Sequence, residues 1–356
     1  MTVYFIVIVL SIVLLSISDE EIRIARSQTT FESKKLNTSF ALFCVMLMFI
    51  AGFRYRVGTD FGAYFYGYKN YVSRLSETIK TLDEPMLSLI DWIAYFFVKE
   101  NIGGTLFPAL ITLFLILRTT FKYSTDLSFS GMLVLFTCWS SCFNGVKQAL
   151  AAAVLYCGYP YLRDKKLVKY IFVAFLAFLC HKSAIIMILV YFICRNKVNA
   201  RNVIFLVIGS LVILLNYDRL FGLIDTLLGI KYAYETDPYI ANDINPLRVV
   251  IYCAPATYYL IKYWNREKTK LQTLCLNFVI IHAVMMIAAS GSAMLGRMGM
   301  YTSTLCLIAI PELNRGLSGE TRKIMKWVIL AFYGLAWLYG IYGSSHLNNF
   351  QFIWQM

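Results

Sequence analysis

Apolar segments recur along the whole chain, separated by short polar connections. Without the alternating pattern of a closed barrel, helix is the only state that satisfies the backbone at membrane depth. Several segments are shorter than the roughly 17–20 residues that a spanning helix needs, so we expect their ends to extend into flanking Tyr, Trp and Ser. The pattern therefore predicts an all-α fold. The thirteen apolar segments are 2–17, 38–53, 86–98, 104–117, 128–142, 145–162, 168–180, 183–194, 202–217, 247–264, 272–290, 298–313 and 323–342.

Composition narrows the class of protein. Of 356 residues, 59% are hydrophobic and 15% are charged, whereas soluble domains have about 45–50% apolar and about 25% charged residues. This balance excludes a water-soluble enzyme, and the aromatic content excludes a disordered chain. We expect one polytopic membrane domain over residues 1–356. Its first apolar run starts directly after Met1 with no basic region or small-residue cleavage site, which predicts a retained helix.

The basic residues predict the topology. The net charge of +13 comes mainly from clusters in the connections, as expected for cytoplasmic loops. From Arg118 onward, basic connections alternate with basic-poor ones. Between Lys35 and Arg118, however, three apolar segments would put two basic loops on opposite sides. Segment 86–98 is short, contains Asp91 and follows Glu84 and Pro85, so we expect that it does not span.

About twelve spans then remain, within a range of 11–13, and both termini lie outside the cytoplasm. Residues 53–103 become an extracytoplasmic loop with a re-entrant or interfacial helix. Residues 218–246 become a second such loop, in which residues 219–231 form an amphipathic helix. Basic residues on the outer side are unexpected under the positive-inside rule, so we look for function there.

The first candidate site follows the second span. Arg54 and Arg56 stand two residues apart before Gly58 and Asp60. Guanidinium groups bind phosphate bidentately and stay charged, so the pair could clamp an anion, and Asp60 could orient an arginine or accept a proton. The alternative is two arginines that snorkel at a helix end.

The second candidate opens a later span. Asn144 and Gln148 are four residues apart, which would place them on one helix face, with Lys147 beside them. Amide side chains also hold membrane helices together, but that role explains the intervening lysine less well.

Two further candidates lie at outer helix ends. His181 is placed to act as a general base, a phosphate partner or a structural donor. Arg297 is the only charged residue between Lys270 and Glu312, and Tyr301 is four residues later. An arginine at membrane depth requires a partner, which would be either a substrate or an internal acid such as Asp60.

Together these residues predict a basic, amide-rich cavity on the outer side. A cavity of this kind favours a protein that binds an anionic lipid-linked substrate over a cation channel. The sequence has no nucleotide-binding, dinucleotide or zinc-protease motif. We expect no cofactor, no metal and no nucleic acid partner.

In these residues the chain resembles the EpsG family of Wzy-like polysaccharide polymerases, over about residues 38–313. The lysine at position 147 stands where the family pattern leads us to expect arginine, which keeps the charge but loses the planar fork. The matching motifs are the RxRxGTD run at Arg54–Asp60, Glu84-Pro85, Asn144–Ala151, the basic loop Tyr161–Lys166, His181–Ala184 and Arg297–Tyr301.

The resemblance implies a bacterial inner-membrane glycosyltransferase with GT-C-like architecture whose site faces the periplasm or exterior. It would transfer a growing O-antigen, capsule or exopolysaccharide chain from undecaprenyl diphosphate onto the next lipid-linked repeat unit. A chain-length regulator and a flippase are its implied partners. The resemblance also implies that Asp60 or His181 removes the proton of the acceptor sugar hydroxyl or orients that hydroxyl. The residues that would contact the diphosphate and the sugars are Arg54, Arg56, Asn144, Lys147, Gln148, Arg297 and Tyr301.

Three alternatives remain open. An O-antigen ligase typically has one long late periplasmic loop, and loop 218–246 is modest. A transporter or flippase for lipid-linked oligosaccharide should show internal pseudo-symmetry and polar residues at mid-membrane depth. A membrane O-acyltransferase with His181 as its base should bind its acyl donor on the cytoplasmic side.

Overall fold

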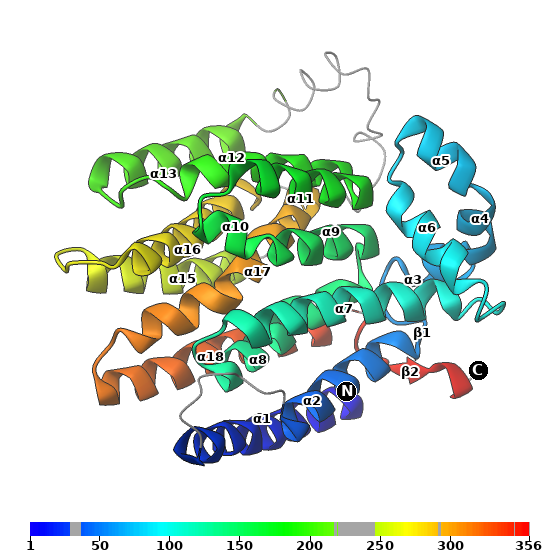
Figure 1. Ribbon diagram of the computed structural model, residues 1–356, viewed down its shortest axis with the longest axis horizontal. Helices are drawn as coiled ribbons and strands as arrows, with labels where there is room; N and C mark the ends of the chain where they lie inside the picture. The colour runs from blue at the N-terminus through cyan, green and yellow to red at the C-terminus, as the bar shows by residue number, and fades with distance from the viewer. Residues whose placement is uncertain (29–36, 217–218, 220–245, 291–292, 345, 356) are drawn as a thin grey trace.

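The protein is a bundle of helices that run side by side, as a computed structural model shows (Figure 1). The structure describes residues 1–28, 37–216, 219, 246–290, 293–344 and 346–355. Four of the described helices are long and apolar enough to cross a membrane. They are α1 (Thr2–Gln28), α7 (Gly103–Tyr123), α16 (Lys270–Ala288) and α18 (Gly319–Tyr342). These findings confirm an all-α membrane protein, while the count of twelve spans stays a prediction.

The other bundle helices are shorter or interrupted. Residues 127–143 form one continuous helical segment whose middle widens into a π-helical turn. The bounds are α2 (Thr38–Gly52), α8 (Leu127–Leu133), η1 (Val134–Trp139), η2 (Ser140–Phe143), α9 (Val146–Cys157), α10 (Tyr159–Arg163), α11 (Leu167–Cys180), η3 (Lys182–Ile186), α12 (Met187–Ile193), α13 (Ala200–Leu215), α15 (Pro246–Tyr263) and α17 (Ala293–Arg315).

Helix α9 lies at the centre of the bundle, packed against α7, α11 and α17. Its consecutive alanines, Ala151–Ala153, are buried, and small side chains let membrane helices approach closely. At the periphery, large apolar side chains face outward instead: Val168 is 80% exposed and Phe205 is 76% exposed. A contiguous apolar exterior of this kind fits lipid rather than water.

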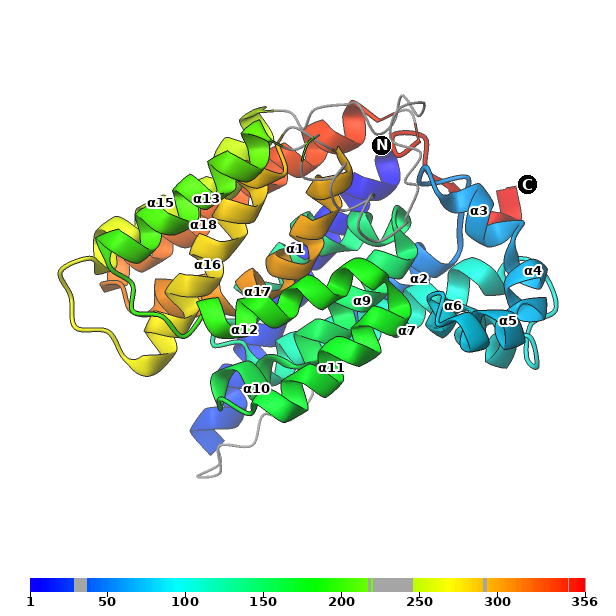
Figure 2. The ribbon, with the colours of Figure 1, turned by 90° about the horizontal axis from the view of Figure 1, so that it is seen from above.

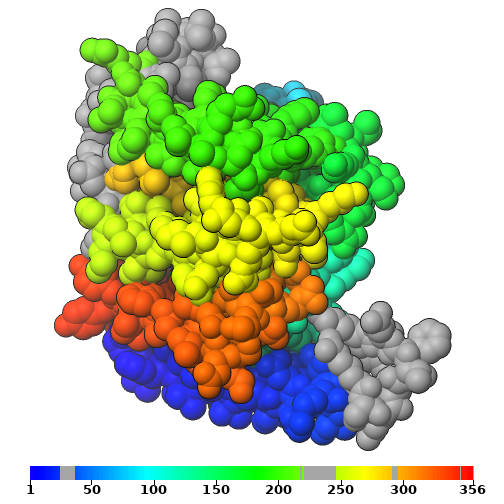
Figure 3. Space-filling model, turned by 90° about the vertical axis from the view of Figure 1, so that its left-hand side faces the viewer, coloured from blue at the N-terminus to red at the C-terminus, as the bar shows by residue number. Residues whose placement is uncertain are grey.

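Basic connections gather at one end of the bundle, which faces the viewer in Figure 3. There, Lys326 Nζ lies 2.9 Å from Asp126 Oδ1, and the Arg163 guanidinium lies 5.6 Å from the Tyr123 ring centroid. These contacts join three connections that the charge pattern predicts to be cytoplasmic.

The opposite end carries a small polar unit between α2 and α7 (Figure 2). Strand β1 (Arg54–Tyr55) pairs antiparallel with β2 (Gln351–Phe352), which is followed by η4 (Ile353–Gln355). The remaining elements are α3 (Phe61–Phe65), α4 (Tyr68–Ser73), α5 (Leu75–Thr81) and α6 (Pro85–Ala94).

Helix α6 covers most of the predicted non-spanning segment 86–98. With ten residues, it is about 15 Å long at 1.5 Å per residue, half of the roughly 30 Å hydrocarbon thickness. Its assignment to the extracytoplasmic side stays a prediction. The predicted amphipathic helix in loop 218–246 lies almost entirely outside the described residues.

Candidate functional site

The residues singled out in the sequence come together mainly at the end of the bundle that carries α3–α6. Four segments contribute: the turn after β1, the start of α6, the start of α9 and the junction of α11 with η3. Helix α17 adds Arg297 and Tyr301 from a fifth direction. Chain segments more than 200 residues apart in sequence therefore meet in one polar cluster.

Asn144 and Gly145 fasten the turn after β1 to the start of α9. The backbone N–H of Thr59 donates to Asn144 Oδ1 at 2.6 Å, and the Gly145 N–H donates to Asp60 Oδ2 at 2.7 Å. Gly145 has φ of +65°, a left-handed conformation that suits glycine. It ends the preceding helical turn, so Asn144 lies outside α9. The expectation that Asn144 and Gln148 share a helix face was wrong for this reason.

Gly58 is the second glycine that this packing requires. Its φ is +100°, and a Cβ atom at this position would lie 2.4 Å from the carbonyl oxygen of Phe143. Its N–H donates to the carbonyl of His346 at 2.9 Å. The turn can therefore approach both the start of α9 and the C-terminal segment only with glycine here.

Arg297 faces this turn from α17. Its Nη2 atom lies 3.8 Å from Asp60 Oδ1, and both side chains are partly exposed. Asp60 Oδ1 also accepts a hydrogen bond from the Thr59 hydroxyl at 3.1 Å. The pair is thus an accessible cation beside a carboxylate that the loop holds in place.

Glu84 organises the other half of the cluster. Its Oε2 lies 3.1 Å from Lys147 Nζ, and its Oε1 accepts the Lys182 N–H at 3.1 Å. His181 Nε2 is 3.8 Å from the same Oε1. Asp83 adds an outer contact, with Oδ1 2.7 Å from Lys182 Nζ.

A hydroxyl network fixes His181 from its other side. Its Nδ1 lies 2.8 Å from Ser183 Oγ, which in turn is 2.7 Å from the Tyr301 hydroxyl. Burial lowers the pKa of His181. The negative charge of Glu84 raises this pKa, whereas three nearby cations lower it further, Lys147, Arg297 and Lys182. The imidazole is therefore neutral near pH 7.

Tyr64 lies between the two halves. Burial raises the pKa of its phenol, and the negative charges of Asp60 and Glu84 raise that pKa further. Its side chain is also hydrogen-bonded to the Lys147 backbone. The two carboxylates therefore share one neighbourhood.

The two arginines after α2 do not converge. Arg54 is 1% exposed, and its guanidinium donates to the carbonyl oxygens of Val57 and Ala51 and lies 5.0 Å from the Phe143 ring centroid. Arg56 is exposed, has φ of +53° and lies over the Tyr55 ring. An anion could reach Arg54 only by displacing its carbonyl partners.

Gln148 lies in the first turn of α9 with 4% of its surface exposed. Within the described part of the chain, its Oε1 has no hydrogen-bond partner. That oxygen is 3.1 Å from where a Cβ of Gly145 would lie, so the amide folds toward the start of the helix. It offers an unused acceptor next to Lys147.

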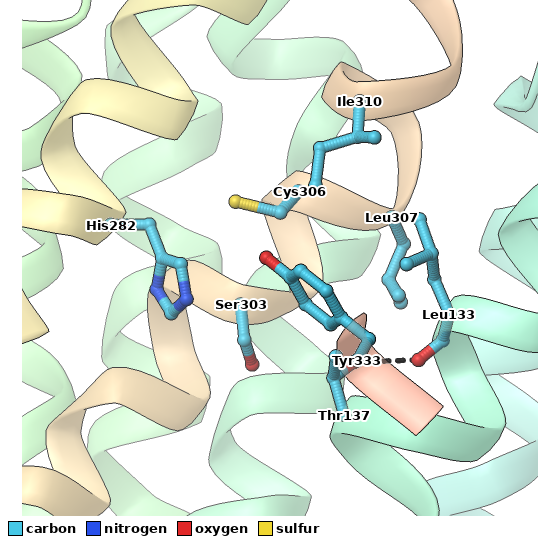
Figure 4. Close-up of a pocket in the computed structure, with 8 residues that line it drawn as sticks. All are labelled: Leu133, Thr137, His282, Ser303, Cys306, Leu307, Ile310 and Tyr333. Carbon is cyan, nitrogen blue, oxygen red and sulfur yellow. Dashed lines mark hydrogen bonds between the residues drawn. The ribbon is translucent and has the colours of Figure 1, made fainter. Parts of the chain in front are cut away.

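A pocket lies between helices of the bundle, away from the outer cluster (Figure 4). It includes His282, Ser303 and Tyr333, and His282 Nδ1 is 2.9 Å from Thr302 Oγ1. No charged residue is among those that line it. It therefore offers nothing to neutralise a phosphate, and the outer cluster remains the better candidate.

Several residues of this cluster are not among the site residues predicted from the sequence, namely Tyr64, Asp83, Glu84, Lys182 and Ser183, and Glu84 is the most central of them. Its signal in the sequence is an acid directly before Pro85, a pattern that also marks an ordinary helix start. Its three partners come from positions 147, 181 and 182, so only the tertiary fold identifies it.

The EpsG family model matches residues 37–354, nearly the whole chain. No curated protein and no solved structure matches the sequence. The matched range contains every residue of the polar cluster, and the chain belongs to the EpsG family.

Proposed function

We propose that this protein is a Wzy-like polysaccharide polymerase. It transfers a growing glycan from undecaprenyl diphosphate onto the next undecaprenyl-diphosphate-linked repeat unit at the outer face of a bacterial cytoplasmic membrane. Membership of the EpsG family supports the general class, and the outer cluster supports the chemistry.

One observation carries the proposal: Lys147 and Arg297, from different helices, face a common partly exposed cluster with two carboxylates. A lipid diphosphate leaving group gains negative charge as the glycosidic bond breaks, and fixed cations at that position lower the barrier. Gln148 Oε1 is an acceptor suited to a sugar hydroxyl. The leaving group is already activated, so the proposed transfer requires no nucleotide.

The sequence indicated that Arg54 contacts the substrate, and in this proposal it has a structural role instead. Its buried contacts make it a positioning residue that holds the turn carrying Asp60. Arg56 remains exposed to solvent and available to an anion.

The test uses purified full-length protein in lipid nanodiscs with an undecaprenyl-diphosphate-linked repeat unit from its source organism. A glycan ladder formed without nucleotide sugar is the expected result, and Arg297→Ala is the inactive control. A parallel reaction includes lipid A core, and transfer only onto that acceptor would indicate a ligase instead. The same protein is also reconstituted in closed liposomes, where movement of the lipid-linked unit across the bilayer without a ladder would indicate a flippase.

A further inference from the structure

Glu84 occupies the point where the contacts of the outer cluster converge. Both of its carboxylate oxygens are engaged with groups from distant segments, Oε2 with Lys147 and Oε1 with the Lys182 N–H. The side chain is 15% exposed, so it is confined but still open to a ligand. No other carboxylate of the cluster contacts both α9 and η3.

The backbone at Glu84 is held in an unfavourable conformation. Its φ and ψ are +51° and +53°, a left-handed geometry that is unfavourable for a residue other than glycine. Glu84 is the N-cap of α6, but its side chain makes no hydrogen bond to the first turn of that helix. The carboxylate is directed to the cluster instead, and strain of this kind concentrates at functional sites.

The two acid–base candidates from the sequence lie in the same cluster. Asp60 Oδ2 accepts the Gly145 N–H at 2.7 Å, and Oδ1 accepts the Thr59 hydroxyl, so Asp60 joins the turn after β1 to the start of α9. Both oxygens of Glu84 are engaged as well, but its ammonium partner Lys147 is closer, at 3.1 Å, than Arg297 is to Asp60, at 3.8 Å. His181 contacts Ser183 through Nδ1, and its Nε2 faces Glu84.

We propose that Glu84 is the general base of the transfer, an assignment that rests on the proposed polymerase function. The acceptor sugar hydroxyl oxygen forms a bond to the anomeric carbon of the donor, and its proton passes to Glu84. The bond from that carbon to the diphosphate oxygen breaks, and undecaprenyl diphosphate leaves with the electron pair. Protonation of Glu84 releases Lys147 from its ion pair, so that its charge faces the diphosphate.

The groups that face Glu84 come from several elements. They are Lys147 from α9, His181 and Lys182 from the η3 junction, Tyr64 from α3 and Tyr301 from α17. Cys180 and the neighbouring Asp83 complete its surroundings. A substitution at Glu84 that removes only its ability to accept a proton therefore tests the assignment.

The experiment measures ladder formation with the wild type, Glu84→Gln and Glu84→Asp in nanodiscs. Glutamine keeps the acceptor for Lys182 but cannot take a proton, so turnover should fall by about 10²–10⁴-fold. Stabilisation by undecaprenyl diphosphate, measured as a thermal shift, should persist. Glu84→Asp keeps a carboxylate that can take a proton and should retain partial activity. Glu77→Gln on α5 is the matched control, since its exposed carboxylate pairs with Arg74 and with no other side chain in the described part of the molecule, and its activity should be unchanged.

Glu84→Gln activity within tenfold of wild type would overturn the assignment. If Glu84→Gln does not fold, Glu84→Asp decides, and full wild-type activity from its shorter carboxylate would count against Glu84. A wild type that forms no ladder would instead refute the polymerase function, and the base assignment with it.

Discussion

Arg297 Nη2 and Asp60 Oδ1 lie 3.8 Å apart, joining α17 to the turn after β1. Side-chain exposures of 44% and 24% place the pair where an ion pair contributes only about 0–1 kcal/mol to stability. We therefore expect Arg297→Ala to fold normally yet lose polymer and the thermal shift produced by undecaprenyl diphosphate.

The double variant Arg297→Ala with Asp60→Asn separates the two possible partners of this arginine, because asparagine removes the charge but keeps an acceptor oxygen for the Gly145 N–H. If the arginine serves structure alone, each single variant should be unstable and the double variant should recover. Recovery with unchanged stabilisation by the lipid diphosphate would remove Arg297 from the substrate site.

Arg54→Lys should destabilise the protein. The guanidinium bonds two backbone carbonyls in a buried setting, and a lysine ammonium cannot reproduce that fork. Losing one charged hydrogen bond costs about 1.5–3 kcal/mol, which a thermal unfolding curve in detergent resolves. Arg56→Lys at the exposed neighbouring position should leave the midpoint unchanged. Equal midpoints for all three proteins would argue against the buried role.

Asp91→Asn should change the pH dependence of stability. Burial in α6, which we predict not to span the membrane, raises the pKa of Asp91 to about 8 from 3.8, and within the described chain neither oxygen has a hydrogen-bond partner. The folded state then binds more protons than the unfolded state, so stability falls from about pH 4 to about pH 8 and levels off above. The unfolding midpoint of Asp91→Asn should lack this decline, whereas Glu267→Gln at an exposed carboxylate should keep it.

Gly58→Ala should displace the turn that carries Asp60. The added methyl group would meet the Phe143 carbonyl at 2.4 Å with φ of +100°, and strain of this type costs about 1–3 kcal/mol. Gly209→Ala in α13, where nothing lies within 4 Å, is the matched control. We expect a lower unfolding midpoint and lost polymer for Gly58→Ala only; a midpoint like that of the control would contradict the tight packing.

Single cysteines at positions 80 and 101 test the topology. Both should react with an impermeant thiol reagent in intact cells if residues 53–103 are extracytoplasmic, in a background without the native cysteines. Labelling at 101 only after permeabilisation would mean that the segment around α6 crosses the membrane.

Hydrophobic patterning was enough to predict the all-α membrane fold and most bundle helices, because lipid leaves few alternatives for apolar segments. The isolated charge of Arg297 also predicted that this residue has a partner, with Asp60 as one possibility, and the two side chains lie 3.8 Å apart. These two inferences depend on composition and position, which the sequence contains directly.

The buried position of the Arg54 side chain and the contacts that Glu84 makes could not be predicted from hydrophobic pattern and charge. Arg54 is satisfied by backbone carbonyls, which no side-chain pattern reveals. Glu84 faces its cluster because of a left-handed backbone conformation and partners about 60 to 100 positions away. The left-handed Gly145 likewise ended the helix that would have carried Asn144.

The pairing of β1 with β2 ties the two ends of the chain to the candidate site. The Met1 ammonium donates to the Asn348 carbonyl at 3.0 Å, and the Tyr4 hydroxyl donates to the Leu347 carbonyl at 2.7 Å. Through Gly58 and His346, the last dozen residues brace the same turn that presents Asp60. Affinity tags and fusion partners at either terminus would therefore pull on the polar cluster itself.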